Sequence, residues 1–376
     1  MHYDVAVLGL GGIGSAVLAH CASRGAKAIG LEQFARGHQL GSSTGRSRMI
    51  RKAYFEDPAY VPRVLRAYKL WHELERDAGE EFLRVTGVLT VGEDTSEIIE
   101  GTRRAASEHG LAIAPLSRSE VEQRYPTLRL LPDEVAIFEK DAGVLWPERA
   151  TDAHLNKASA AGATVCFETA VRSWRTAADG CEISLSNGDR VNAAKLVIAT
   201  GPWMQQQLQE FGVDLRIQRN VQAWFAPATD AYQASRFPAF LLNRRGLPAP
   251  LYGFPDFGDG VKIAFHGHGD LTTADEIDRA IDEERDIEPL IRATEAWMPE
   301  ATANLLAAKP CMYSLTRDEH FVVDRHPVHE NVVICGGFSG HGFKFASVIG
   351  EIAADLALNG GTQHAIGFLS LSRFGS

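Results

Sequence analysis

The feature that most constrains the fold is an apolar run at the start of the chain, followed at once by a glycine-rich turn. Residues 3–9 have the pattern of a parallel strand buried on both faces. The turn Gly9-Leu10-Gly11-Gly12-Ile13-Gly14 matches GxGxxG, and residues 15–24 then have helical periodicity. A second strand is predicted over residues 26–31 and is followed by Glu32. This order of strand, turn, helix and strand predicts an α/β fold with a Rossmann-like nucleotide site.

Each residue type in this unit has a physical role. Gly9 permits the tight turn, Gly11 lets the backbone approach a pyrophosphate, and Gly14 allows the helix to pack closely on the strand. The helix N-terminus would then face the phosphates. Glu32 could accept hydrogen bonds from the adenosine ribose hydroxyls, which disfavours NADP. The motif alone leaves FAD and NAD open, as well as a tight turn without a ligand.

Composition and charge narrow the class of protein. A chain of 376 residues is long enough for two domains. The net charge of -10, without a basic block, argues against a nucleic-acid partner. The apolar start has no basic region before it and is interrupted by glycines, so we expect neither a secretion signal nor a membrane span. Five scattered cysteines without CxxC spacing argue against disulfides and a metal site, and favour a cytoplasmic location.

Two later segments favour a flavin over a nicotinamide cofactor. Residues 190–201 predict a strand that ends in Ala199-Thr200-Gly201, followed by Trp203. Residues 331–337 predict another buried strand, and residues 338–345 open a helix that runs to about residue 358. One helix N-terminus can take the pyrophosphate, while the other places its positive end beside the flavin ring, which carries negative charge when reduced.

Five further stretches occur in a specific order: residues 41–51 (GSSTGRSRMIR), 252–255 (YGFP), 309–314 (KPCMYS), 318–321 (DEHF) and 337–345. On these stretches the chain resembles the monomeric sarcosine oxidase and N-methyltryptophan oxidase family over nearly its whole length. The resemblance implies an FAD-binding domain with a central parallel sheet and a substrate domain built on a mixed antiparallel sheet. We expect the first domain in residues 1–85, 150–215 and 311–376, and the second in 86–149 and 216–310.

The resemblance also implies that FAD is attached covalently through Cys311, by a thioether to the flavin. The residues expected to contact FAD come from both predicted helix openings, the 41–51 stretch and the segment around Cys311. They are Gly9, Gly11, Gly12, Ile13, Gly14, Glu32, Ser42, Ser43, Thr44, Arg48, Gly201, Trp203, Cys311, Met312, Gly337, Phe338, Gly340, Gly342, Phe343 and Lys344.

The expected catalytic and substrate-binding side chains are mostly cations. By resemblance, Arg48 lies against the flavin, whereas Arg51 and Lys344 hold the substrate carboxylate. We expect Arg48 and Arg51 on a helix or turn, where residues three apart lie near one face. Strand alternation over residues 260–266 places Lys262, Ala264 and His266 on one face.

By the same resemblance, Lys262 activates dioxygen by stabilising superoxide with its fixed charge. Tyr252 and His266 would line the pocket and orient the substrate amine.

The implied reaction oxidises a small secondary amino acid such as sarcosine. A hydride passes to the flavin, dioxygen is reduced to hydrogen peroxide, and the imine hydrolyses to formaldehyde and an amino acid. We expect a monomer. Thr44 stands where the family has a histidine, and this leaves the substrate open. The alternatives are an oxidase of a cyclic amino acid such as proline or pipecolate, a dehydrogenase with an acceptor other than oxygen, and a catalytically silent flavoprotein.

Overall fold

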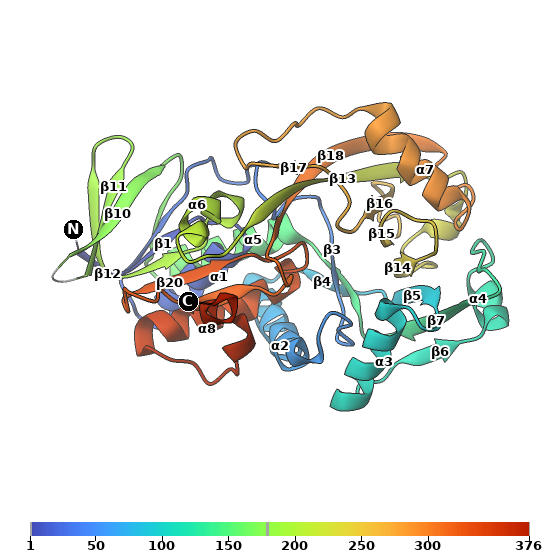
Figure 1. The fold of residues 1–376 in the computed structure, drawn as a ribbon, viewed down its shortest axis with the longest axis horizontal. Coiled ribbons are helices and arrows are strands. Elements are labelled where there is room, and N and C mark those ends of the chain that lie inside the picture. Colours follow the sequence, from blue (N-terminus) through green and yellow to red (C-terminus); the bar gives the residue numbers. More distant parts are fainter. Residues whose placement is uncertain (1, 178–179, 376) are drawn as a thin grey trace.

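The computed structural model describes residues 2–177 and 180–375 and contains two large sheets joined by a small third sheet. Figure 1 shows the two large sheets at opposite ends of the long axis, with β13 (Arg216–Ala226) and β18 (Asn304–Leu315), two long strands of the second sheet, reaching toward the centre. Within the described residues, we find no helix with the length and apolar character needed to cross a membrane.

The first sheet has a parallel centre. Its strands are β1 (His2–Leu8), β2 (Ala28–Leu31), β9 (Thr164–Cys166), β10 (Val171–Ala177), β11 (Gly180–Leu185), β12 (Arg190–Ile198), β19 (Val322–Arg325) and β20 (Val332–Gly336). β1 lies between β2 and β12, and β12 also pairs in parallel with β20. Val5 and Val7 pack into one core, whereas Ala6 and Leu8 pack into another, as expected for a strand buried on both faces.

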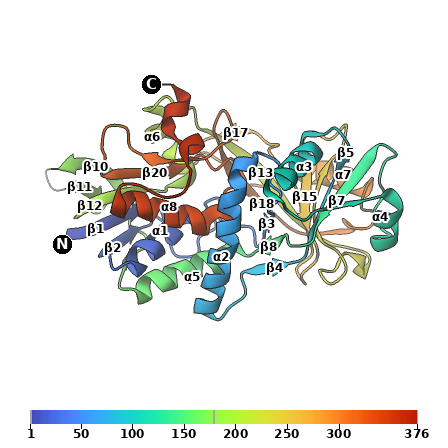
Figure 2. The ribbon, with the colours of Figure 1, turned by 90° about the horizontal axis from the view of Figure 1, so that it is seen from below.

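Helices gather on one side of this sheet (Figure 2). They are α1 (Gly12–Ser23), α2 (Val61–Ala78), α5 (Pro147–Ala160) and α8 (Ala346–Asn359). α1 packs against both α5 and α8, and Gly350 lies so close to Ala16 that a Cβ atom there would be 2.6 Å from the alanine methyl group. This close packing fixes the N-terminus of α1 at the carboxyl edge of the sheet.

The second sheet is mixed and mostly antiparallel. Its strands are β5 (Val88–Glu93), β6 (Ala114–Leu116), β7 (Glu134–Glu139), β13 (Arg216–Ala226), β14 (Ala239–Asn243), β15 (Leu251–Phe254), β16 (Val261–Phe265), β17 (Leu271–Thr272) and β18 (Asn304–Leu315). One pair, β5 with β14, is parallel. The helices of this half are α3 (Glu97–His109), α4 (Arg118–Arg124) and α7 (Glu288–Glu295). Alternate residues of its strands, such as Phe225 and Ile263, pack with Leu290 of α7 in one core, so the intervening residues face away from that core.

The third sheet consists of β3 (Arg48–Ile50), β4 (Leu83–Val85) and β8 (Gly143–Leu145). The short elements that remain are the helix α6 (Gln205–Gln209), the 3₁₀ turns η1 (Pro58–Tyr60), η2 (Gly201–Met204), η3 (Asp230–Tyr232), η5 (Phe343–Phe345), η6 (Gly367–Leu369) and η7 (Leu371–Phe374), and the π turn η4 (Glu283–Ile287). β18 pairs with β13 over residues 304–315, so the predicted domain boundary at 311 falls inside one strand of the second sheet.

The prediction of a helix or turn for Arg48 and Arg51 is wrong. Arg48 begins β3, which pairs antiparallel with β8, and Arg51 follows immediately after the strand. A strand of three residues is stabilised by pairing with a strand that is distant in the sequence. It is too short to show a periodic pattern of apolar residues.

Candidate active site

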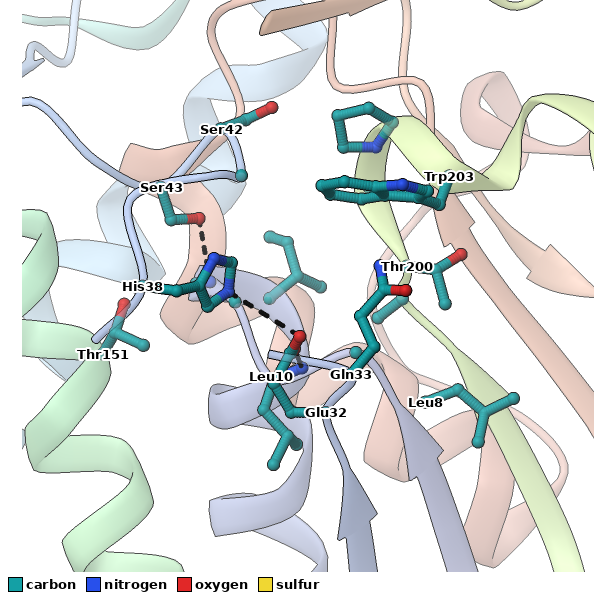
Figure 3. A pocket seen from close by; sticks show the side chains of 18 of the residues that line it. Leu8, Leu10, Glu32, Gln33, His38, Ser42, Ser43, Thr151, Thr200 and Trp203 are labelled. Atoms are coloured by element: carbon teal, nitrogen blue, oxygen red, sulfur yellow. Dashed lines mark hydrogen bonds and ion pairs between the residues drawn. The ribbon is translucent and has the colours of Figure 1, made fainter. Parts of the chain in front are cut away.

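A cavity of about 390 Å³ opens at the carboxyl ends of the parallel strands of the first sheet. It is lined by the turn after β1, the residue after β2, the segment after β12 and the segment after β20. In open α/β sheets, ligands bind at this edge. Figure 3 shows Leu10, Glu32, Ser43 and Trp203 around the cavity.

The first turn is built for close backbone approach. Gly9 has a φ of +82°, and a Cβ on Gly14 would lie 1.7 Å from the Gly9 carbonyl oxygen. α1 begins after Gly11 without a side-chain cap, although the Gly12 N–H donates to the Ser43 Oγ at 2.9 Å. The free N–H groups of this helix opening therefore face the cavity edge.

Glu32 is buried at the end of β2 and is held in place by the backbone. Its Oε2 accepts the Leu10 N–H at 2.8 Å, and its Oε1 accepts the Phe34 N–H at 3.1 Å. His38 Nε2 lies 3.7 Å from Oε1 (Figure 3). A carboxylate can accept more hydrogen bonds than these, so Glu32 retains capacity toward the cavity.

Several buried polar atoms along this cavity have no hydrogen-bond partner in the described structure. They are Thr44 Oγ1, Thr151 Oγ1, Thr200 Oγ1 and Gln207 Oε1. Buried polar groups are normally paired, so these atoms indicate a polar ligand. A dinucleotide, with its phosphates, ribose hydroxyls and ring amides, fits such a lining.

The second sheet contributes its other face to the site. Cys311 pairs with Asn220, Gln222 pairs with Ala264, and Ala264 pairs with Tyr252. Because paired residues point to the same side of a sheet, this register gathers side chains from four strands. The expectation that Lys262 and Ala264 share a face agrees with β16, and His266 follows directly after that strand.

Cys311 is buried, with its Sγ 3.7 Å from Arg48 Nη2. Arg48 is fixed by the backbone: its Nη1 donates to the Ser47 carbonyl at 2.9 Å and its Nη2 to the Ser42 carbonyl at 2.9 Å. Ser42 Oγ donates to the Met312 carbonyl at 2.8 Å. The 41–51 stretch is thereby joined to β18 around the thiol.

Lys262 is only 1% exposed. Its Nζ donates to the Gly45 carbonyl at 2.7 Å and to the Ser47 carbonyl at 2.9 Å, and it lies 5.0 Å from the centre of the Phe254 ring. Burial, reinforced by the charge of Arg48, holds the pKa of Lys262 well below its usual value. Lys262 is absent from the lining of both cavities, since the 45–47 turn covers it.

A second cavity of about 70 Å³ adjoins the first, and the two share Arg48, Tyr313, Gly340 and Phe343. Its lining consists of Arg48, Met49, Arg51, Phe55, Glu56, Gln222, Leu241, Tyr252, His266, Tyr313, Gly340, His341, Phe343 and Lys344. Four of the residues predicted to act on the substrate, Arg51, Tyr252, His266 and Lys344, therefore lie around one small space.

The two predicted carboxylate-binding cations flank the same aromatic ring. Arg51 Cζ lies 4.7 Å, and Lys344 Nζ 5.0 Å, from the centre of the Tyr54 ring. Arg51 Nη2 is paired with Glu56 Oε2 at 2.6 Å. Burial, together with Arg51 and Arg48, lowers the pKa of Lys344 to about 7.

Burial opposes the ionisation of Glu56. The neighbouring side chains of Arg51, His341 and Lys344 nevertheless lower the pKa of its carboxyl group to about 2. Glu56 is thus an internal carboxylate partner for this cation pair.

The histidines of the second cavity are neutral. Burial lowers the pKa of His266 to about 4 and that of His341 to about 3. His341 Nε2 lies 3.1 Å from the Glu319 carbonyl, which can only accept a hydrogen bond, so Nε2 carries the proton. Tyr54 therefore donates its hydroxyl hydrogen to His341 Nδ1, at 2.5 Å. His266 Nδ1 lies 3.1 Å from the Tyr313 hydroxyl.

Most residues predicted to contact the cofactor line the first cavity, whereas Gly14, Gly337 and Lys344 do not. Gly14 instead supports the turn, and Lys344 belongs to the second cavity. The sequence analysis missed Tyr54, Glu56, Gln222 and His341. Gln222 had no distinguishing signal in the sequence, because β13 also contains Gln218, Arg219 and Asn220, and its position beside the turn of Gly45 follows only from the sheet register.

A family model described as FAD dependent oxidoreductase matches residues 4–356. The chain belongs to the FAD-dependent oxidoreductase family. The match covers nearly the full length of the chain, and the prediction that the cofactor is FAD is confirmed.

Its similarity to individual family members also extends end to end. The monomeric sarcosine oxidase of Streptomyces avermitilis is 40% identical over 378 residues, which cover 99% of this chain and 97% of that protein. The monomeric sarcosine oxidase of Bacillus sp. (strain B-0618) is 38% identical, with coverage of 99% and 96%. The N-methyl-L-tryptophan oxidase of Yersinia pestis (strain Pestoides F) is 30% identical, with coverage of 100% of both. These relatives confirm the resemblance drawn from the sequence stretches.

Solved structures share the same fold. NikD, described as an unusual amino acid oxidase, superimposes in its open form with a TM-score of 0.86 at 23% identity, covering 98% of this chain and 97% of that chain. Glycine oxidase from Geobacillus kaustophilus gives a TM-score of 0.82 at 20% identity, with 99% coverage of both chains. The predicted fold class is therefore confirmed.

Proposed function

We propose that the protein is an oxidase of small secondary amino acids, such as sarcosine or another N-methyl amino acid, and that it acts as a monomer. The observation that carries this proposal is the second cavity, a small space that adjoins the cavity suited to FAD and is lined by two buried cations, a tyrosine and a neutral histidine. Bound FAD would accept a hydride equivalent from the carbon attached to nitrogen and would return the electrons to dioxygen as hydrogen peroxide.

The first cavity would hold FAD between the two helix openings. The backbone N–H group of Gly11 at the opening of α1 would face the pyrophosphate, and Glu32 would accept hydrogen bonds from the ribose. The position of Cys311 beside Arg48 supports a covalent thioether link, since attachment requires the thiol as a nucleophile next to positive charge. We also propose that those residues predicted to contact the cofactor that line this cavity bind FAD.

In the second cavity, Arg51 and Lys344 would bind the substrate carboxylate. An incoming carboxylate would compete with Glu56 for Arg51, because that guanidinium is already paired. Tyr252 and neutral His266 would orient the amine in its neutral form over the ring. Hydrolysis of the imine from an N-methyl substrate would give formaldehyde and the demethylated amino acid.

The test is a screen of the purified protein with sarcosine, N-methylalanine, proline and pipecolate, with peroxide and formaldehyde both measured. We expect the N-methyl substrates to give equal amounts of peroxide and formaldehyde. Faster turnover of the cyclic substrates would assign the protein to cyclic amino acids. Substrate-dependent reduction of a dye without peroxide would show a dehydrogenase and would overturn the proposed oxidase.

Lys262→Met tests the proposed oxygen-activating role separately. Loss of a fixed positive charge near the site of oxygen reduction should slow reoxidation of the reduced protein by about a hundredfold or more, while substrate affinity stays within about threefold. Stopped-flow mixing of reduced protein with oxygenated buffer measures the first rate. A reoxidation rate equal to that of the native protein would remove Lys262 from the mechanism.

A further inference from the structure

A carboxylate outside the predicted set lies behind the turn that holds Lys262. Glu148 is half-buried in the first turn of α5, and its Oε1 accepts two successive backbone N–H groups, from Gly45 at 2.7 Å and Arg46 at 3.1 Å. The same turn presents the Gly45 and Ser47 carbonyls to Lys262 Nζ, at 2.7 and 2.9 Å. The turn thus carries an anion on its N–H side and a cation on its carbonyl side.

The backbone of this turn is specialised for that arrangement. Gly45 has a φ of +105° and Arg46 a φ of +61°. The second value is uncommon for a residue with a Cβ atom. Successive N–H groups in such conformations form a concave anion site, which Glu148 fills. A Cβ on Gly45 would lie 2.0 Å from Gln222 Oε1, so the turn cannot move toward β13.

We propose that Glu148 is a positioning residue for Lys262. This inference rests on the role given to Lys262 in the proposed function. By binding the N–H groups of the turn, Glu148 fixes the two carbonyls that direct the lysine ammonium, so that loss of Glu148 would release both the turn and the orientation of Lys262. Glu148 also supplies a negative charge near that ammonium.

The ionisable groups that face Lys262 come from several elements. Arg48 lies on β3, Cys311 and Lys309 lie on β18, and Glu148 lies on α5. Of these, Arg48 and Lys309 disfavour the charged lysine, whereas Glu148 favours it. The carboxylate therefore acts on Lys262 in two separable ways, through the geometry of the turn and through its charge.

Two substitutions separate these effects. Glu148→Ala removes both hydrogen bonds, and we expect reoxidation of dithionite-reduced protein by oxygen to slow at least about tenfold. Glu148→Gln keeps an acceptor oxygen for the two N–H groups, so the rate near neutral pH should return to within about threefold of the native rate. In the Gln variant the fall in rate at high pH should occur at lower pH, because the ammonium has lost a nearby negative charge.

The double variant decides whether the effect passes through Lys262. If it does, Glu148→Ala added to Lys262→Met causes no further loss of rate. An additive loss, a native rate in Glu148→Ala, or a Gln variant as slow as the Ala variant would each overturn the proposal. Glu97→Ala, an exposed acid in the first turn of α3, is the matched control and should reoxidise at the native rate.

Chemical reduction keeps this test independent of the substrate. A protein that no amino acid reduces would contradict the proposed function, yet its reoxidation after dithionite would still report on Glu148. The flavin absorbance spectrum and melting temperature of each variant show whether the fold is kept. Should Glu148→Ala fail to fold, the pH displacement in the Gln variant alone supports or overturns the proposal.

Discussion

At the scale of single residues, the candidate site places cationic side chains in buried positions. Lys344 is buried beside Arg51, and its Nζ donates to the His341 carbonyl at 3.0 Å. A buried ammonium near other cations loses its proton more easily than one in water. The charge of the proposed carboxylate site therefore changes within the physiological pH range.

This predicts a pH dependence for carboxylate binding. Since the pKa of Lys344 is about 7, the free protein holds a charged lysine below that pH and a neutral one above it. Acetate, which has no amine to titrate, should bind progressively more weakly above pH 7, by up to about tenfold per pH unit. Titration of the flavin absorbance with acetate at several pH values measures the dissociation constant.

The ionisable groups next to Lys344 do not titrate in the pH range over which acetate binding is measured. Glu56, His266 and His341 have pKa values of about 2, 4 and 3, all below the range examined. Lys344→Met should bind acetate weakly at every pH from 6 to 9. A Met variant that keeps the native pH dependence would assign the titration to another group.

At the scale of elements, the site depends on glycines that allow two backbone segments to approach each other closely. Gly14 is the clearest case, because its α-carbon faces the backbone carbonyl of Gly9. Gly14→Ala should cost at least about 1–3 kcal/mol of stability by overpacking. Its melting temperature and the amount of bound FAD should both fall.

Gly361→Ala is the control for this change, since a Cβ there would meet no atom within 4 Å and its φ lies outside the left-handed region. We expect that variant to keep the native melting temperature and FAD content. An undiminished FAD content in Gly14→Ala would mean that the turn can relax, and would remove this glycine from the cofactor site.

Elements with strong local patterns were predictable from the sequence. The strands β1, β12 and β20 and the helices that follow the glycine turns lie close to their predicted ranges. β3 was not predictable, because its pairing with β8 joins residues 48–50 to residues 143–145. The continuous course of β18 was missed for the same reason, since its length is set by β13 rather than by its own sequence.

Side-chain partners were the least predictable part of the site. The sequence shows Arg51 and Lys262 but not that Glu56 or the 45–47 turn holds them. Long charged side chains pair according to distances fixed by the tertiary fold, and these distances have no local signature. The family stretches identified the cations, whereas the structure was needed to find their counterions.

At the scale of the whole molecule, the two large sheets meet around the proposed cofactor position. Leu10 and Phe343 line the first cavity from the half that contains the parallel sheet, and Cys311 and Tyr313 line it from β18. A ligand bound by both halves stabilises the folded state by mass action. A covalent bond would make this stabilisation independent of the free FAD concentration.

The substitution Cys311→Ser tests whether FAD is bound covalently. Acid precipitation of the native protein should leave the yellow colour in the pellet, whereas the variant should release it to the supernatant. The melting temperature of the variant should rise with added FAD, as expected for reversible binding. Cys166→Ser, at the end of β9, should behave as the native protein does. Colour released from the native protein would exclude the covalent link.

The interleaved order of the strands in the first sheet also affects how the protein is made. β1 emerges from the ribosome early, but its neighbour β12 ends at residue 198, and β20 ends at residue 336. Because domains fold only when their parts are available, a nascent chain has no complete nucleotide pocket until β20 has been synthesised. Flavin loading should therefore follow the synthesis of β20, and chains truncated before β20 would be released without the yellow colour of the flavin.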